Sequence, residues 1–443
     1  MDKRILIIGA GPAGLGAGLA LHDLGYENWK IYEKEDYVGG LSASFRDEMG
    51  FTWDLGGHVL FSNDEAFNAI FERVMEGEYL EHQREAWIRY KGSWVPYPFQ
   101  NNLKYLPLHE QLLCLAGLAG TRLWPNRSAA ADFEEWLQHT FGKGICRSFM
   151  IPYNRKVWSY DLHEMGYQWI SQRVSVPSFW RLAGNVALRR DDIDWGPNNT
   201  FKFPSKGGTG NIFKRMSTNI KHKVDFGKNV IKISADMKKI TTSDGQEDGY
   251  DILISTMPLD ELVCALDEKD AALSNAAQGL KSNKVTVVGV GAKRTNPSTK
   301  CWMYFVDSGV PFYRMTNFSH YSPFNVPGGK TDHFSSLMCE TSHVGDKGED
   351  EIVERTIEAL LSEGFLQGAE EVVSIYVKTL PKAYPIPTKD RDTRLSHIKA
   401  FLDCNDICSI GRFGTWKYEI GNMDHAVMMG YKTCERIIGE EVQ

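Results

Sequence analysis

The chain has 443 residues and a formal net charge of −7, so it exceeds a single typical core and we expect two or three structural units. An acidic chain is a poor general nucleic-acid binder, and the absence of an apolar run of about 18 residues argues against a membrane span. The eight cysteines are scattered without a CxxC pair, and the first residues lead straight into an apolar run. We therefore expect a cytoplasmic protein with reduced thiols and no metal site.

The first apolar run leads into a glycine-rich turn that is typical of dinucleotide binding. Residues 4–10 predict a strand buried on both faces, and Gly9, Gly11 and Gly14 then give a GxGxxG pattern before a helix. The first glycine serves the tight turn, the second lets the backbone approach a pyrophosphate, and the third lets helix and strand pack closely. A second predicted strand ends at Glu33, whose carboxylate can bind a ribose hydroxyl. This order of elements predicts a Rossmann domain.

A second glycine pair follows Glu33 almost at once. Gly39, Gly40, Leu41 and Ser42 resemble the second glycine motif of FAD enzymes that have a glutathione-reductase-like Rossmann domain. The predicted strand at residues 250–258 resembles the returning strand of the same domain. This resemblance favours FAD over NAD, and the alternative for the glycine pair is an ordinary flexible turn.

Two further segments combine glycine, histidine and aromatic residues. Gly57 lets the backbone pass close to a ligand, over which the ring of His58 can lie; a satisfied core histidine is the alternative. Farther along, two prolines stiffen a loop that contains Tyr97, Phe99 and Gln100. Stacking and edge hydrogen bonds from such a loop could hold a nucleobase, whereas the alternative is a small buried aromatic cluster.

The remaining chain divides into a helical part and a part made of short strands. Residues 107–190 have helical periodicity, and strand patterns dominate from residue 284 onward, interrupted by one helix at 349–364. A last strand at 407–410 precedes a helix that begins near residue 422, where free backbone N–H groups suit an anion. The expected α/β fold is a discontinuous FAD-binding Rossmann domain (1–65, 205–265 and 405–443) with an inserted helical domain (105–190) and an inserted antiparallel-sheet substrate domain (66–104, 191–204 and 266–404).

Seven motifs, spread over nearly the full length, together resemble the UDP-galactopyranose mutase family, in particular its eukaryotic type. They are residues 56–59, 94–102, 152–158, 201–210, 312–314 with 321–323, 384–385, and 411–425. The sequence departs from the family pattern at Arg155, where an aromatic residue is expected, and at Met315, Asn317 and His320. It is also shorter than fungal members.

The resemblance implies a fold, a reaction and a set of residues. The implied enzyme interconverts UDP-galactopyranose and UDP-galactofuranose through a covalent adduct between the sugar and N5 of reduced FAD, with NADH or NADPH as reductant. The implied partner is a UDP-hexose, and the implied assembly is a monomer or homodimer. The implied catalytic residues are Arg173, Arg314 and His58. The implied cofactor-binding residues are Gly9, Gly11, Gly14, Glu33, Gly40, Leu41, Ser42, Gly57, Val230, Arg412, Asn422 and Met423. The implied substrate-binding residues are Tyr97, Phe99, Gln100, Asn154, Trp158, Asn198, Tyr304, Tyr384, Tyr418 and Asn422.

Three alternatives stay open on the sequence alone. The first is a mutase for another nucleotide sugar. The second is an FAD amine-oxidase-like oxidoreductase, which would need an apolar substrate cage and no pair of diphosphate-binding arginines. The third is a non-catalytic protein that FAD merely stabilises.

Overall fold

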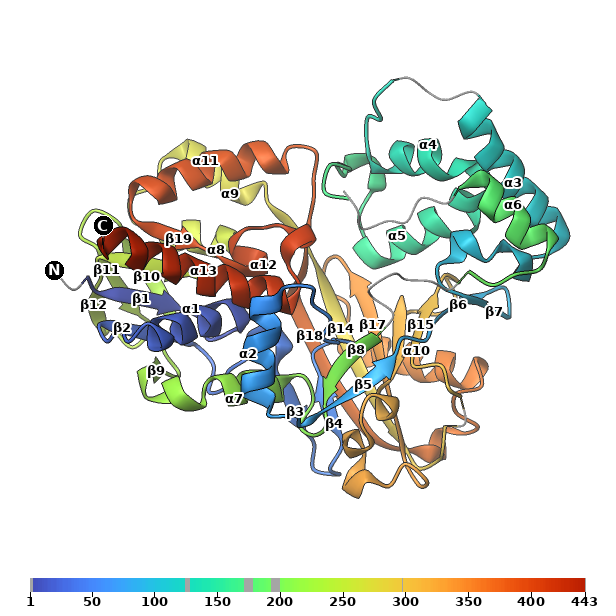
Figure 1. Cartoon of the computed structure of the whole chain (residues 1–443), viewed down its shortest axis with the longest axis horizontal. Coiled ribbons are helices and arrows are strands. Elements are labelled where there is room, and N and C mark those ends of the chain that lie inside the picture. The colour runs from blue at the N-terminus through green and yellow to red at the C-terminus, as the bar shows by residue number, and fades with distance from the viewer. Residues whose placement is uncertain (1–2, 124–127, 171–177, 193–199, 297, 443) are drawn as a thin grey trace.

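A computed structural model gives the structure of the chain for residues 3–123, 128–170, 178–192, 200–296 and 298–442. Figure 1 shows a layered α/β part that holds both termini, a long twisted sheet beside it, and a helical unit above that sheet. The predicted α/β fold class, a Rossmann domain with helical and antiparallel-sheet parts, is confirmed.

The α/β part is built on a sheet of five parallel strands. Their order is β19 (Ile407–Ser409), β13 (Ile252–Ser255), β1 (Ile5–Ile8), β2 (Trp29–Tyr32) and β9 (Val224–Asp225). Ile5 and Ile7 point into one core and Leu6 and Ile8 into the other, which explains the uninterrupted apolar run. The first core contains α1 (Pro12–Asp23), α2 (Glu65–Met75), α7 (Gly210–Met216) and α13 (Met423–Val442). The second contains α8 (Leu259–Ala265), α9 (Ala271–Gln278) and α11 (Arg391–Cys404).

The domain ranges predicted from the sequence assign three of these helices to a different part of the molecule. Those ranges placed α2, α9 and α11 with the antiparallel sheet, whereas their apolar faces fill the two cores of the parallel sheet. The short helix α12 (Gly411–Gly414) follows β19 and leads toward α13. Within the described residues, no helix is long and apolar enough to cross a membrane.

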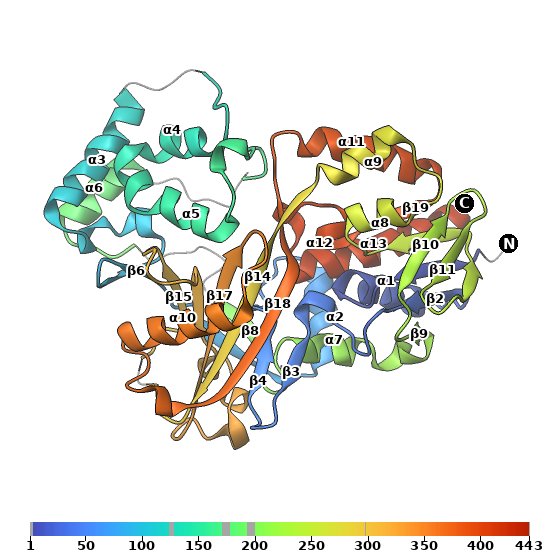
Figure 2. The same ribbon diagram turned by 180° about the vertical axis from the view of Figure 1, so that it is seen from behind.

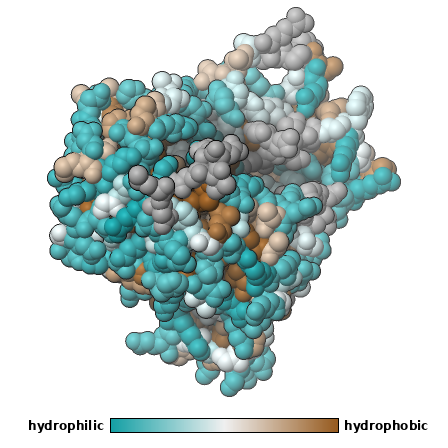
Figure 3. Space-filling view, turned by 60° about the vertical axis from the view of Figure 1, so that its left-hand side comes forward, coloured by the Kyte–Doolittle hydropathy of each residue, from teal (hydrophilic) through white to brown (hydrophobic). Residues whose placement is uncertain are grey.

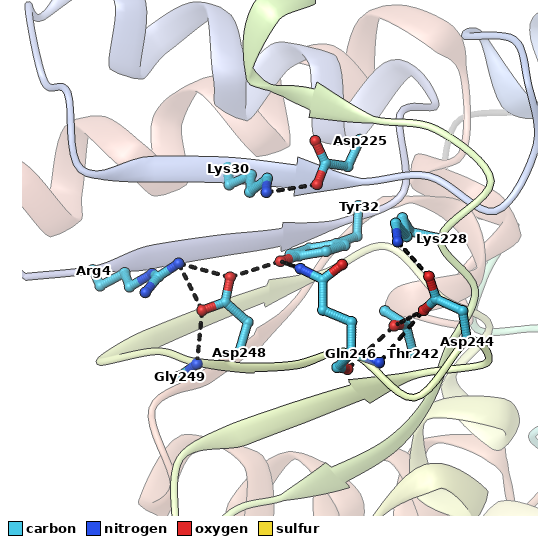
Figure 4. A network of polar contacts seen from close by, with 10 residues as sticks. All are labelled: Arg4, Lys30, Tyr32, Asp225, Lys228, Thr242, Asp244, Gln246, Asp248 and Gly249. Carbon is cyan, nitrogen blue, oxygen red and sulfur yellow. Dashed lines mark hydrogen bonds and ion pairs between the residues drawn. The ribbon is translucent and has the colours of Figure 1, made fainter.

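A small antiparallel sheet packs on the second core of the parallel sheet and also makes polar contacts with it. It consists of β10 (Val230–Ser234), β11 (Lys239–Thr242) and β12 (Glu247–Gly249). Figure 4 shows Asp248 of β12 between Arg4 and Tyr32, with 2.6 Å from the Tyr32 hydroxyl to Oδ2 of Asp248. Burial, followed by the Asp248 contact, raises the pKa of Tyr32, so its hydroxyl stays a donor. This network fixes Val230, at the start of β10, relative to β2.

The long sheet has seven strands. Their order is β18 (Val372–Ile386), β14 (Lys281–Ala292), β17 (Ser335–His343), β16 (Arg314–Asn317), β15 (Trp302–Phe305), β6 (Ala86–Tyr90) and β7 (Ser93–Pro96). All neighbours are antiparallel except β15 and β6. The outer face is covered by α10 (Glu349–Ser362), and the other face turns toward the helical unit. In Figure 2, β14 and β18 run from the α/β part to the far end of this sheet.

Two short antiparallel strand pairs, of which only the first is a hairpin, connect the long sheet to the α/β part. They are β3 (Ser44–Arg46) with β4 (Thr52–Asp54), and β5 (Tyr79–Gln83) with β8 (Thr200–Pro204). Trp53 of β4 packs directly on Gly289 of β14, where a Cβ would lie 2.5 Å from the indole ring. A side chain at that position would therefore push the two parts of the molecule apart.

The helical unit contains α3 (Leu108–Leu123), α4 (Phe133–Ile145), α5 (Ile151–Trp158) and α6 (Phe179–Ala187). Glycines bring α3 and α4 together, because a Cβ at Gly142 would lie 2.3 Å from the backbone of Gly117. A π-helical turn at Cys146–Met150 joins α4 to α5, and α5 then reaches the long sheet. This arrangement carries the 152–158 motif to the sheet face.

Candidate active site

Two glycine-rich loops face one another at the end of β1. Gly9 has a φ of +97°, and a Cβ at Gly14 would lie 1.9 Å from the Gly9 carbonyl oxygen, so both positions need glycine for the fold itself. Gly11 differs, because the nearest atom to a Cβ there is Cα of Gly40, at 3.9 Å. A space that a Cβ at Gly11 would enter without a clash therefore lies between the first loop and the turn formed by Gly40–Ser42. Such a backbone-lined cradle fits the pyrophosphate of a dinucleotide.

Glu33 is anchored beside this cradle. Its Oε2 accepts a hydrogen bond from the backbone N–H of Ala10 at 2.6 Å, and its Oε1 accepts one from Glu35 at 2.9 Å. Burial raises the pKa of Glu33, although these two backbone donors oppose that effect. The carboxylate therefore stands at the end of β2 in a fixed orientation, with lone pairs left for a ribose hydroxyl.

A cavity lies where the first glycine loops meet the long sheet. Apolar and charged side chains line it together: Leu41, Leu55, His58, Val285, Arg314, Glu340, Leu380, Ala383, Tyr384 and Arg412. Figure 3 shows hydrophobic residues gathered at the middle of one face of a largely hydrophilic surface. The apolar members come from the turn after Gly40, from the residue after β4, and from β14 and β18, so they offer walls for a flat ring system such as a flavin.

His58 faces this cavity as a neutral imidazole. Its Nδ1 is buried without a hydrogen-bond partner among the described residues. Burial lowers the pKa of His58 to about 4, helped by the charges of Arg412 and Arg314 and opposed by Glu340. An orphaned buried nitrogen is costly unless a ligand satisfies it, which fits a cofactor or substrate bound over the ring.

We expect the depressed pKa of His58 to be measurable as a pH-dependent stability. An unfolded histidine takes up a proton near pH 6.5, whereas His58 does so only near pH 4, so stability falls as pH drops from 6.5 toward 4. At pH 5 this loss amounts to about 2 kcal/mol. His58→Gln should lose less stability than the wild type between pH 7.5 and 5, measured by thermal unfolding of both proteins. Equal losses in the two proteins would contradict a depressed pKa.

One row across the long sheet brings the central polar residues together. In the strand register, Tyr304 of β15 lies opposite Arg314 of β16, which in turn lies opposite Glu340 of β17. Arg314 donates from Nε to Oε1 of Glu340 and from Nη2 to Oε2, each at 2.6 Å. The Glu340 side chain is only 3% exposed. Burial would raise the pKa of Glu340, but the charge and hydrogen bonds of Arg314 outweigh it, so the pKa lies below its usual range.

Glu340 also binds two further groups of the site. It accepts a hydrogen bond from the backbone N–H of Gly57 at 2.9 Å and one from the hydroxyl of Tyr313 at 2.8 Å. The Tyr313 hydroxyl lies 3.0 Å from that of Tyr384. One buried carboxylate thus joins the loop that carries His58, the guanidinium of Arg314, and a tyrosine that contacts Tyr384.

Arg412 closes the cavity from the C-terminal side. It lies in α12, donates from Nε to the Gly421 carbonyl at 2.9 Å, and places its guanidinium 5.8 Å from the ring centre of Tyr384. Asn422 is exposed and Met423 half-buried at the start of α13. Asn422 and Met423 therefore lie at the N-terminus of α13, directly after Gly421, which Arg412 of the cavity wall contacts.

The predicted uridine residues belong to an aromatic stack between α5 and the long sheet. The ring of Tyr304 lies 5.4 Å from that of Tyr97 and 5.3 Å from that of Tyr153. Phe99 is fully buried and stacks on Phe149 at 4.8 Å, so it supports this wall from behind. Gln100, also predicted, is 3% exposed beside it.

A second aromatic group surrounds Trp158. The ring of Tyr418 lies 5.0 Å from Trp158 and 5.5 Å from Tyr384. Asn283 of β14 donates to the Val157 carbonyl at 3.0 Å and accepts from the backbone N–H of Tyr384 at 3.0 Å. This buried amide fixes the end of α5 to β18. Asn154, one turn earlier, donates to the Met150 carbonyl within its own helical segment.

Sequence reasoning missed several residues of this site. Glu340 and Asn283 lie in β-strands that contain no recognisable motif. The sequence does place one acidic residue, Glu340, in the buried strand Ser335–His343, and this is a signal that could have indicated a functional role. Arg84 is also new: its guanidinium lies 4.7 Å from the ring centre of Trp302, and that of Arg314 lies 5.1 Å from the same ring. Two positive charges therefore converge on one indole.

The departures from the family pattern do not face the cavity. Arg155 points outward and pairs with Glu134 at 2.9 Å. Met315 is buried on the α10 side of the sheet, while Asn317 bonds to Ser319 and His320 is half-buried beyond them. Arg173 and Asn198, predicted from the resemblance, lie outside the described residues. Among those that are described, no group of histidine, cysteine, aspartate and glutamate could hold a metal ion.

Comparisons with known proteins agree with this geometry. The chain matches the family described as flavin containing amine oxidoreductase over residues 12–438. Zeta-carotene desaturase of Capsicum annuum is 38% identical over 73 residues, which are 16% of this chain and only 12% of that protein. Cyclohexylamine oxidase from Brevibacterium oxydans IH-35A is 15% identical with a TM-score of 0.71 over the whole of both chains, which shows the shared fold alone.

The crystal structure of a reduced UDP-galactopyranose mutase is similar over nearly its whole length. It is 39% identical to this chain with a TM-score of 0.95, and the match covers 100% of this chain and 95% of that one. The family match and this similarity confirm FAD as the cofactor. The chain is therefore a flavoprotein enzyme of the flavin containing amine oxidoreductases and belongs, within them, to the UDP-galactopyranose mutase family.

Proposed function

We propose that this enzyme interconverts UDP-galactopyranose and UDP-galactofuranose on reduced FAD. The observation that carries this proposal is the cavity in which Arg314, tyrosine hydroxyls and the histidine loop converge next to the flavin-binding loops. A ring contraction of this kind needs a site that releases a diphosphate, retains it, and returns it to the sugar. Charged and hydroxyl donors around the cavity suit that task, whereas an apolar cage would not.

The residues present fit FAD along its length. Gly11 and Gly40 leave room for the pyrophosphate, Glu33 can bind a ribose, and Val230 lies in the small sheet beyond it. Leu41, with the apolar residues of β14 and β18, would line the ring system. When bound and reduced, FAD supplies a nucleophilic N5 nitrogen for covalent bonding to the anomeric carbon while UDP is detached.

The diphosphate would be held by charge at Arg314 and by neutral hydroxyls around it. Burial raises the pKa of Tyr304 and of Tyr384, so both keep their protons and can donate to phosphate oxygens. Tyr418 lies beside Tyr384 and can do the same. Arg173 is proposed as the second diphosphate arginine on the family resemblance. Planar guanidinium groups match phosphate geometry and stay charged.

The uridine would bind against the aromatic stack that connects α5 with the long sheet. Tyr97 offers a ring face, Gln100 an amide, and Asn154 and Trp158 border the same space. Phe99 would act through packing behind Tyr153. Asn198 is proposed as a further substrate ligand on the resemblance.

His58 would serve the flavin side of the cavity without adding charge. With a pKa of about 4 it is neutral at pH 7, so its ring nitrogens can donate to or accept from cofactor and sugar groups. Gly57 keeps the backbone close, because a Cβ there would lie 2.6 Å from Oγ1 of Thr316. Arg412 and Asn422 would contribute from the opposite side.

The proposed function is tested by turnover of reduced and oxidised enzyme. Dithionite-reduced protein should convert UDP-galactopyranose to UDP-galactofuranose, separated by chromatography, and NADH or NADPH may be compared as reductants. Equal turnover in air without a reductant would exclude attack by N5. A panel of other UDP-hexoses tests the substrate, and UDP should raise the melting temperature of this enzyme but not that of an amine-oxidase-like protein.

We further expect Glu340→Gln to separate substrate binding from turnover. The amide keeps the size of the side chain but removes the charge that orients and neutralises Arg314. UDP should then bind tighter by roughly fivefold, because the cavity gains net positive charge, while kcat falls by at least about tenfold. Calorimetry with UDP and steady-state kinetics measure the two effects.

Tyr313→Phe is the matched control for this substitution. It removes one hydrogen bond to the same carboxylate and the hydroxyl contact with Tyr384, but it leaves both charges of the ion pair in place. UDP affinity should therefore stay near the wild-type value. Unchanged UDP affinity and kcat in Glu340→Gln would contradict the role assigned to the ion pair.

A further inference from the structure

The outer face of the helical unit is apolar to an unusual degree for a solvent-exposed helix. Leu108, Leu112, Leu113 and Leu123 of α3 are 59–70% exposed, while Cys114 and Leu118 on the opposite side are buried. Figures 1 and 2 both place α3 and its neighbour α6 at the end of the molecule farthest from the termini. The exposed leucines recur along one side of the helix and have no core to fill.

The residues around this face are basic. Arg122, Lys143, Arg189 and Arg190 are exposed, and none of them forms an ion pair within the described parts of the chain. Residues 105–190 contain ten Lys and Arg but six Asp and Glu, a net charge of +4 in a chain of −7, which leaves −11 for the rest. The charge of the helical unit is thus opposite to that of the molecule.

Two contacts and one position in the sequence locate these charges beside α3. Lys143 of α4 is adjacent, because a Cβ at Gly117 would lie 3.2 Å from its backbone nitrogen. At the other side, Lys104 donates to the carbonyl of Arg189 at 2.8 Å, just before the chain enters α3. Arg122 is in α3 itself. The nearby acids are already neutralised in ion pairs: Glu110, Asp191 and Asp192.

We propose that this face, formed by α3 and the C-terminal end of α6, docks on the surface of an anionic lipid bilayer. The exposed leucines of α3 lie beside Arg122 of the same helix and beside cations of neighbouring segments. Such a combination suits a lipid interface, with apolar side chains in the acyl boundary and cations at the headgroups. The helix has 16 residues, too short and too interrupted by charge to span, so it would lie in the plane of the surface.

A bilayer suits this face better than a second copy of the chain. Two-fold pairing through α3 would bring the same basic residues of two subunits together, and repulsion between them would oppose the contact. Anionic headgroups instead compensate each cation by attraction. The acidic remainder of the chain would point away from the membrane, which orients the molecule.

The test is sedimentation of the FAD-loaded enzyme with vesicles of phosphatidylcholine alone or with one quarter phosphatidylglycerol, at low and high salt. We expect binding to the anionic vesicles that salt weakens, and little binding to the neutral ones. The variant R122Q/R189Q/R190Q should lower the affinity roughly a hundredfold. Leu112→Gln with Leu113→Gln should lower it at least about tenfold, because both apolar contacts are lost.

A matched control uses exposed apolar residues far from this face. Ile231→Gln with Met237→Gln changes side chains that are 53% and 66% exposed on the small sheet, and vesicle binding should not change. Flavin absorbance verifies that each variant is folded. The proposal fails if the wild type binds neither vesicle, if it binds both equally, or if the leucine pair has no effect. It also fails if light scattering finds a dimer that the leucine pair dissociates, since the face would then join two subunits.

Discussion

Arg314→Ala is expected to lower kcat by more than about a hundredfold while weakening UDP binding much less. In the proposed reaction, each charge-assisted hydrogen bond to the diphosphate would contribute roughly 1.5–3 kcal/mol, and the leaving diphosphate would carry most charge in the transition state. Steady-state kinetics and calorimetry with UDP measure the two quantities. Arg314→Lys should recover only part of kcat, because a single ammonium cannot reproduce the planar fork.

This substitution needs a stability control, because it also leaves the buried carboxylate of Glu340 without its positively charged partner. Breaking a buried ion pair on one side typically costs about 3–5 kcal/mol, so part of the loss in Arg314→Ala could come from unfolding. Arg314→Met combined with Glu340→Gln removes both charges and should restore thermal stability. Turnover should nevertheless stay low. Recovery of turnover in this double variant would show that Arg314 acts only as a structural partner of Glu340.

Gly11→Val is expected to abolish FAD binding while leaving the protein folded. The nearest atom would lie 3.9 Å from a Cβ at this position, which is an ordinary contact, so the backbone there accepts a side chain. Its side chain would instead fill the space that the pyrophosphate needs. Flavin absorbance after purification and circular dichroism measure the two outcomes.

Gly14→Ala is the contrasting variant for that experiment. A Cβ there would lie 1.9 Å from the Gly9 carbonyl oxygen, so alanine disturbs the packing of α1 on β1 whether or not FAD is present. We expect loss of folded protein rather than loss of flavin alone. Full flavin content in Gly11→Val would show that the dinucleotide binds elsewhere.

The sequence predicted those parts of the site that depend on neighbouring residues. The loop from Gly9 to Gly14 and the strand ending at Glu33 are local patterns, and their geometry follows from short-range sterics. The ion pair of Arg314 with Glu340 is of another kind. It depends on the register of β16 against β17. The sequence of one strand does not predict which residue of the other strand lies opposite a given position.

The position of the helices was harder to predict than their existence. The last strand and the helix at 422 were recognised by periodicity, yet the predicted ranges put α2, α9 and α11 with the wrong core, because an apolar face does not identify its partner. Asn283 was missed for a similar reason. A buried amide in a strand gains its role only from the carbonyls that α5 brings to it.

The contact between α1 and α13 has a consequence for the order of synthesis. A Cβ at Gly16 would lie 2.2 Å from the Val427 carbonyl, and one at Gly430 would lie 2.0 Å from that of Ala13, so the first and last helices are in backbone contact. The ribosome makes α1 long before α13, because most of the described elements lie between them in the sequence. The apolar side of α1 therefore stays without its partner, exposed or bound by chaperones, until α13 has emerged from the ribosome. Shortening α13 should therefore leave a protein that cannot form the flavin pocket, although every residue of the first glycine loop is present.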